Sequence, residues 1–192
     1  LIFLTGCWDR TEPEDQALVI VGGYDYNPET NMYKIIGTIE NMSFEGGGSG
    51  AGSDAPPFWV VSAWGETSTD AIENISKKVS KNINYNHLHL LLLSETIVRE
   101  RGIIPVMDSL ARSRQSRPIV EITVVKGELE KMIKGSIPIE NTSGLGLANQ
   151  IKINKERLGT AINQNARKFL QKLSNPGIEP VAVCLELINE DS

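Results

Sequence analysis

The chain has 192 residues, a net charge of −5, and a globular mixture of 40% hydrophobic and 22% charged residues. This length can bury a hydrophobic core without disulfide bonds, and the composition argues against a chain that is disordered throughout. Nucleic-acid backbones require clustered positive charge, so the acidic balance argues against a nucleic-acid partner and against a purely electrostatic hold on anionic lipid.

Residues 1–7 resemble the end of an apolar signal segment. The tetrapeptide Leu4-Thr5-Gly6-Cys7 places small residues before a cysteine, which is the order in a bacterial lipobox, and the Cys7 thiol can accept a diacylglyceryl group. Two acyl chains anchor a protein stably, and no apolar run reaches the roughly 18 residues of a transmembrane helix. We therefore expect lipidation at Cys7 and an anchored protein. The alternative is a buried first strand with an incidental cysteine.

A polar tether is expected at residues 8–16, followed by strands at 17–26 and 32–41. Turn residues at 27–31 join these strands and predict an antiparallel pair. The glycine-rich residues 46–52 predict a flexible loop, because they lack the Gly-Lys-Ser/Thr ending of a phosphate-binding loop. A third strand is expected at 58–66.

The middle of the chain predicts helices between strands. Capping residues at 67–70 precede apolar residues at helical spacing, and three lysines suit the end of that helix. An apolar strand at 85–93, covered on both faces, is expected next, and then helices at 94–101 and from Pro105. A strand at 119–126 and a short helix at 128–134 complete the order. We predict an α+β domain at 17–143 with a mixed sheet of about five strands packed with helices.

The pattern changes near residue 143. A loop at 139–147, a mostly helical stretch at 145–173 and a strand at 180–188 predict that residues 144–192 form a helical connection and the start of a truncated second α+β domain. The last strand has no evident partner in this chain. Cys184 within it is expected to be a small buried hydrophobic residue with no disulfide.

Two histidines are candidates for chemistry. His87 and His89 lie two apart on an expected strand, and they therefore face the same side. A metal site needs a third or fourth ligand, which no other histidine supplies, so we predict no metal and leave their role open.

Three arginines and a tryptophan are candidates for contacts. Arg112, Arg114 and Arg117 form a basic cluster with two arginines at 99 and 101. A solvated helix end is favoured over a docking surface for a partner or for lipid headgroups. Trp8 follows Cys7, and indole prefers the membrane interface, so headgroup contact is one hypothesis and packing on the domain is the other.

The lipobox cysteine followed by Trp-Asp-Arg, and then residues 17–25, resembles the start of the Ger(x)C spore germination lipoproteins, the C subunits of nutrient germinant receptors. The segments 66–72, 86–87, 94–95, 101–108 and 169–180 resemble later parts of that family in the same order. The glycine-rich loop is unusually long for the family. The resemblance covers nearly the whole chain.

The resemblance implies an N-terminal part of a longer protein with an α+β first domain. It implies a lipid anchor on the outer face of the spore inner membrane, beside integral-membrane A and B subunits. It supplies no catalytic residues, no cofactor and no small-molecule ligand, so we expect a non-enzymatic protein that works through protein contacts. The alternative is a membrane-anchored solute-binding lipoprotein, which needs a concave pocket with convergent polar groups.

Overall fold

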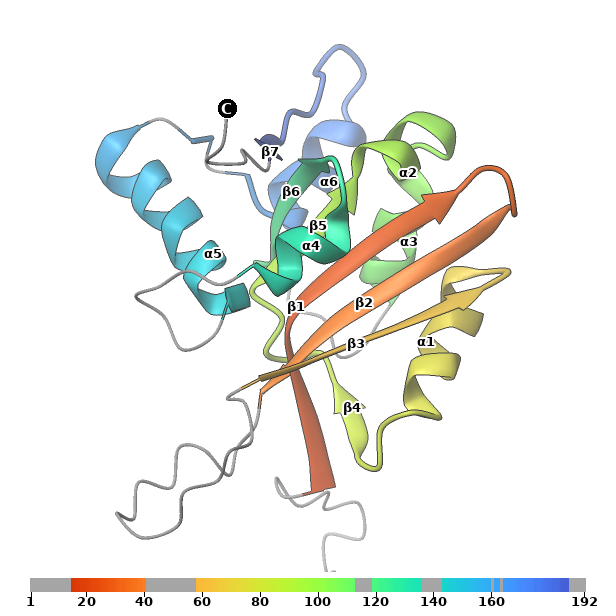
Figure 1. Cartoon of the computed structure of the whole chain (residues 1–192). Helices are drawn as coiled ribbons and strands as arrows, with labels where there is room; N and C mark the ends of the chain where they lie inside the picture. Colours follow the sequence, from red (N-terminus) through yellow and green to blue (C-terminus); the bar gives the residue numbers. More distant parts are fainter. Residues whose placement is uncertain are drawn as a thin grey trace, which may run out of the picture.

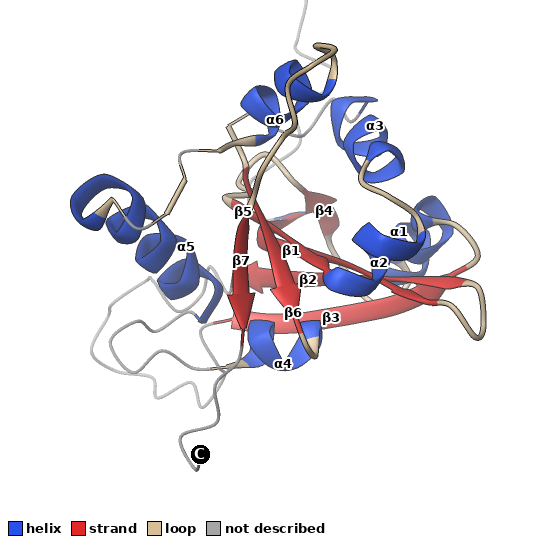
Figure 2. Cartoon of the chain, turned by 90° about the horizontal axis from the view of Figure 1, so that it is seen from above, coloured by secondary structure: helices blue, strands red, loops and turns tan. Residues whose placement is uncertain are grey.

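The computed structural model describes residues 15–40, 58–112, 119–135, 143–159, 161–162 and 164–186. Within them the chain forms one mixed β-sheet with helices on both faces (Figures 1 and 2). The strands are β1 (Gln16–Asn27), β2 (Met32–Glu40), β3 (Phe58–Gly65), β4 (Asn82–Asn84), β5 (Leu90–Ser94), β6 (Glu121–Lys126) and β7 (Val183–Glu186). The helices are α1 (Ser68–Ser76), α2 (Glu95–Glu100), α3 (Ile104–Arg112), α4 (Leu129–Lys134), α5 (Ser143–Ile153), the π-helical η3 (Asn154–Leu158) and α6 (Ala166–Leu173).

The sheet has an antiparallel half and a parallel half. Its strand order is β3-β2-β1-β5-β6-β7. Strands β1, β2 and β3 pair antiparallel, whereas β1, β5, β6 and β7 pair parallel, and β4 adds a parallel pairing to the first residues of β1. The expected α+β fold and mixed sheet are confirmed. The described strands number seven, where about five were expected, because β4 and β7 also join the sheet.

Each face of the sheet carries its own hydrophobic core. On the first face, α1, α2, α3 and α6 pack side chains such as Ile75, Ile97 and Phe169. On the second face, α4 and α5 pack side chains such as Ile133 and Ile151. Figure 2 shows these two groups of helices on opposite sides of the strands.

Strand β5 divides its four leucines between the two cores. Leu91 and Leu93 face the first core, and Leu90 and Leu92 face the second. All four are at most 1% exposed. The prediction of a strand covered on both faces is therefore confirmed, as expected for a parallel strand between helical layers.

The boundaries of two expected strands are corrected. Strand β1 begins at Gln16, which pairs with Asn82, so residue 16 belongs to the sheet and not to the tether. The strand expected at 85–93 begins only at Leu90. Residues 85–88 form a turn in which the Leu88 amide donates to the Tyr85 carbonyl at 3.0 Å. The apolar residues that follow directly led to the prediction that the strand begins at residue 85.

The long helical stretch expected at 145–173 is broken. Helix α5 already begins at Ser143, inside the expected loop, and continues through η3 as far as Leu158. Gly159 then adopts a φ of 64°, a left-handed conformation that commonly ends helices. Helix α6 starts anew after Asn165, whose side chain accepts from the Lys168 amide at 3.0 Å.

The last strand has a partner within the chain, which corrects the prediction that it stands alone. Strand β7 pairs parallel with β6, with Val183 opposite Thr123. Cys184 is exposed and free rather than buried, because alternate residues of this edge strand leave the core. Whether a second domain begins beyond residue 144 stays a prediction.

Candidate functional site

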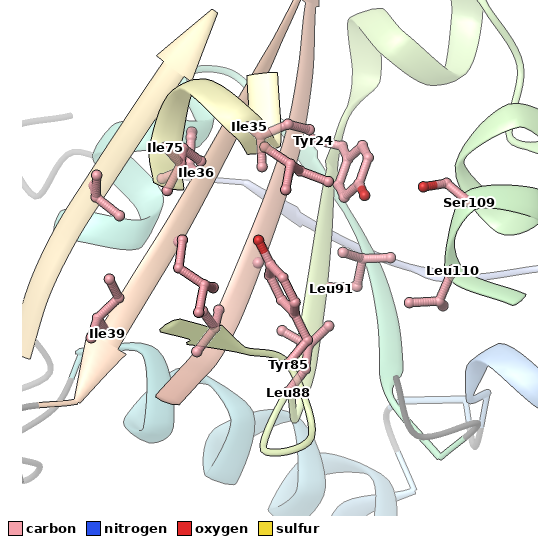
Figure 3. Close-up of a pocket in the computed structure, with 16 residues that line it drawn as sticks. Tyr24, Ile35, Ile36, Ile39, Ile75, Tyr85, Leu88, Leu91, Ser109 and Leu110 are labelled. Carbon is pink, nitrogen blue, oxygen red and sulfur yellow. The ribbon is translucent and has the colours of Figure 1, made fainter. Parts of the chain in front are cut away.

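An apolar cavity of about 70 Å³ lies between the first face of the sheet and helices α1 and α3 (Figure 3). Strands β1, β2 and β3 form its floor. Helix α1 contributes Ile72 and Ile75, α3 contributes Ser109 and Leu110, and the turn before β5 contributes Tyr85. None of the sixteen described residues that line it carries a charge. The cavity is therefore suited to neutral, mostly apolar groups.

A pair of glycines opens the space. Gly22 of β1 and Gly37 of β2 stand directly opposite in the antiparallel ladder, and both line the cavity. Opposite residues of such a pair point to the same face of the sheet, so two side chains are missing at one place. A Cβ atom built on Gly37 meets only Val19 and Val61, at 3.7 Å and 3.8 Å, whereas one built on Gly22 would lie 3.3 Å from Leu88, so the free room is at Gly37. A glycine within a strand often marks a site that a ligand approaches closely.

A β-bulge in β1 determines which residues of this strand face the cavity. The register between β1 and β2 shifts between Val19 and Val21. Val19 packs in the first core, whereas Ile20 and Val21 both pack in the second. The extra residue restores the alternation, so that Gly22 and Tyr24 line the cavity together with Val19. Bulges frequently re-aim side chains beside functional sites.

Three hydroxyl groups reach the apolar lining. The ring of Tyr24 lies beside Ser109, and the hydroxyl of Tyr85 points among the aliphatic side chains (Figure 3). Burial raises the pKa of Tyr24, and a hydrogen bond with Ser109 offsets part of that rise. Burial, with a smaller contribution from Tyr24, raises the pKa of Tyr85 to about 12. Both phenols are therefore neutral at physiological pH.

A larger polar pocket of about 720 Å³ adjoins the cavity near the start of β1. Side-chain amides line it, and the Asn84 amide donates to the Gln16 carbonyl oxygen. Ile72, Ile83 and Tyr85 line both the polar pocket and the apolar cavity. These three residues therefore form the boundary between the two spaces.

The two histidines do not lie on a strand, which corrects the sequence prediction. His87 is in the turn before β5 and His89 directly precedes β5, and both side chains are exposed on either side of buried Leu88. The backbone of His89 accepts from the Glu121 amide at 3.0 Å. Among the residues that the structure describes, no group of three histidine, cysteine or acidic residues could hold a metal ion.

The arginines at the end of α2 make separate local contacts. Arg99 bonds to Glu95 one turn earlier at 2.7 Å. The guanidinium of Arg101 lies 4.5 Å from the ring centroid of Tyr26, and it also donates to Asn31 at the tip of the β1–β2 hairpin. Arg101 thus ties α2 to the hairpin through a cation–π contact.

The remaining predicted contact residues have little or no described structure. Arg112 is the last residue of α3. Cys7, Trp8, Arg114 and Arg117 lie outside the described residues, as does the glycine-rich loop. No described helix is long and apolar enough to cross a membrane.

Comparison with known proteins identifies relatives over the whole chain. Residues 9–187 match the family described as Spore germination protein N-terminal domain. Spore germination protein KC of Bacillus subtilis (strain 168) is 28% identical over 194 residues, which covers 100% of this chain and 47% of that protein. Putative spore germination protein YfkR of the same strain is 31% identical over 142 residues, covering 72% of this chain and 36% of YfkR. Spore germination protein B3 is 27% identical over 127 residues, covering 66% of this chain and 33% of B3.

The chain spans about half the length of protein KC and about a third of the other two. No solved structure matches it significantly.

Proposed function

The chain belongs to the spore germination protein N-terminal domain family, and from this membership we propose that the protein acts in nutrient-triggered spore germination. It does so as a lipid-anchored, non-enzymatic subunit of a germinant receptor on the outer face of the spore inner membrane. The observation that carries the proposal is the family match over residues 9–187, together with similarity to spore germination protein KC along the full chain.

Lipid anchoring rests on the lipobox at residues 4–7. The family match begins at residue 9, two residues after Cys7, so the cysteine immediately precedes the domain. Seven residues, 8–14, separate Cys7 from Asp15, where the described structure begins. The eight steps along the backbone from Cys7 to Asp15 therefore span at most about 29 Å. The anchor therefore holds the first residues of β1 and the neighbouring polar pocket close to the membrane surface.

A lipid anchor at Cys7 is tested in spores that carry the full-length protein. Cys7→Ala should release the protein from the membrane fraction and impair nutrient-triggered germination. Cys184→Ala is the matched control, because Cys184 is exposed and free, and its loss should change neither location nor germination. A Cys7→Ala protein that stays membrane-bound and fully supports germination contradicts the proposal.

Protein contact is supported by exposed apolar side chains near the start of β6. Ile119, Leu158 and Ile162 are 62%, 63% and 47% exposed. The ion pair between Lys155 of η3 and Glu121 of β6, at 2.6 Å, brings their segments together. An exposed apolar patch commonly marks an interaction surface, and we propose that these three side chains contribute to one. The proposed partners are the integral-membrane A and B subunits.

A photo-crosslinking residue at position 158 should capture one of these two subunits in intact spores. The same group at Lys77, exposed on the end of α1, serves as the control and should capture neither. Equal yields from the two positions contradict a contact at Leu158. Trp8, Arg112, Arg114 and Arg117 stay predicted contacts with a partner or with lipid headgroups.

A further inference from the structure

We propose that the apolar cavity beneath α1 and α3 binds a small uncharged molecule, with a branched aliphatic body and one neutral hydrogen-bonding group. This site goes beyond the role in germination and does not depend on it. The family resemblance implied no small-molecule ligand, so the cavity points to a property that the resemblance did not supply.

The volume limits the size of the ligand. One water molecule needs roughly 10–15 Å³ of such volume. A cavity of about 70 Å³ therefore accommodates about five water-sized groups, which corresponds to a ligand with a four-carbon branched body and one polar atom. This space is too small for a sugar or for most amino acids.

The lining selects a neutral ligand. Side chains such as Ile35, Ile75 and Leu91 surround the space, and no charged residue among those described lines it. A charged group moved into such surroundings loses its hydration without gaining a counter-ion, so ammonium and carboxylate compounds are disfavoured. The hydroxyl of Tyr85 lies among these aliphatic side chains, where it can bond to one polar atom of the ligand.

The floor of the cavity is built from positions that usually carry side chains. A glycine inside a strand forgoes packing and costs backbone entropy. Here two glycines are in register, and Gly37 has room for a larger residue. Valine at position 37 would project its methyl groups into the space that the ligand is proposed to occupy.

The polar pocket provides the access route. It shares Ile72, Ile83 and Tyr85 with the cavity, so a ligand that enters through it meets these three residues first. Tyr85 belongs to the turn between β4 and β5 and not to a strand. Rotation of its side chain can therefore open the boundary without unpairing the sheet.

The test is a methyl NMR titration of the full chain with isobutanol. We expect saturable shifts confined to methyl groups that line the cavity, such as those of Ile75 and Leu110. Isobutylammonium and isobutyrate have nearly the same carbon skeleton with a charge, and they should give no saturable shifts. Shifts spread over the surface, or equal responses to the three compounds, contradict the proposal.

Variants assign the binding to the cavity. Tyr85→Phe keeps the ring and should weaken isobutanol binding by roughly two- to tenfold, which is typical for the loss of one neutral hydrogen bond. Tyr33→Phe is the matched control, because Tyr33 is partly buried and does not line the cavity, and it should leave the affinity unchanged.

Gly37→Val should abolish binding. Gly37→Ala fills less of the cavity and serves as a second variant in case valine prevents folding. It should lower the affinity for isobutanol. Unchanged affinity in both Tyr85→Phe and Gly37→Ala overturns the proposal.

Discussion

In the parallel half of the sheet, Leu90, Leu92 and Leu93 of β5 are almost completely enclosed between two helical layers, and only Leu91 of this strand borders the cavity. In the antiparallel half, Gly22 and Gly37 face each other across β1 and β2 and leave a space beneath α1 and α3. The two halves share β1 and have the same kinds of aliphatic neighbours. The difference shows that one sheet can be tightly packed over most of its parallel half while keeping an opening that lies mainly over its antiparallel half.

The largest effect is expected where the packing is tightest. Leu92→Ala should reduce the free energy of unfolding by about 2–5 kcal/mol, because it leaves a new void in a core with no room to relax. Leu110→Ala removes the same atoms beside the existing cavity and should cost clearly less. Chemical denaturation of the two variants measures the difference. Equal losses would show that the two halves are packed alike.

Neighbouring glycines provide a sharper comparison. A Cβ atom on Gly23 would lie 2.8 Å from Ile133 and 3.2 Å from Leu129 on the second face, so Gly23→Ala should destabilise by about 1–3 kcal/mol. Gly37→Ala meets only ordinary contacts and should instead stabilise by about 0.5–1 kcal/mol. Thermal unfolding of the two variants shows whether each substitution lowers or raises the stability. A stabilising Gly23→Ala would contradict the close approach of α4 to β1.

A further small effect is expected at alkaline pH. The folded-state pKa of Tyr85 is raised to about 12, above the usual value of 10.0. Its contribution to stability is therefore complete below pH 10 and is lost as the pH rises towards 12. Tyr85→Phe should remove this pH-dependent loss of stability. The difference in the free energy of unfolding between the unmodified protein and Tyr85→Phe should therefore change by on the order of 1 kcal/mol between pH 9 and pH 11. Titrating groups that do not interact with Tyr85 are common to both proteins and cancel in the comparison.

The order of helices and strands could be predicted from the sequence because periodicity and capping residues are local signals. Thr67 begins α1 with a capping box to Asp70, and Ser94 accepts from the Ile97 amide at 3.1 Å at the start of α2. The break at Gly159 was harder to predict, because the apolar residues on its two sides continue a helical spacing. The pairing of β7 with β6 could not be predicted, since it joins segments about sixty residues apart.

The cavity depends on a register that the sequence leaves open. Both glycines lie within expected strands, but a five-residue turn at 27–31 would place Tyr26 opposite Met32. In the structure Asn27 pairs with Met32, and this difference of one residue brings Gly22 opposite Gly37. The bulge near Val19 also depends on how β1 pairs with β2, and this pairing could not be predicted from the neighbouring residues. The candidate site was therefore missed, although two glycines in adjacent strands were a visible signal.

The position of β1 has a mechanical consequence. With an anchor at Cys7, any force between the membrane and the domain enters at the first residue of β1 and acts along that strand. Strand β1 hydrogen-bonds to β2, β4 and β5, so these bonds are loaded in shear and must fail together. A tether attached to the edge strand β3 could peel it away one bond at a time. In the proposed arrangement the load would thus enter through β1, which has three pairing partners, more than any other described strand.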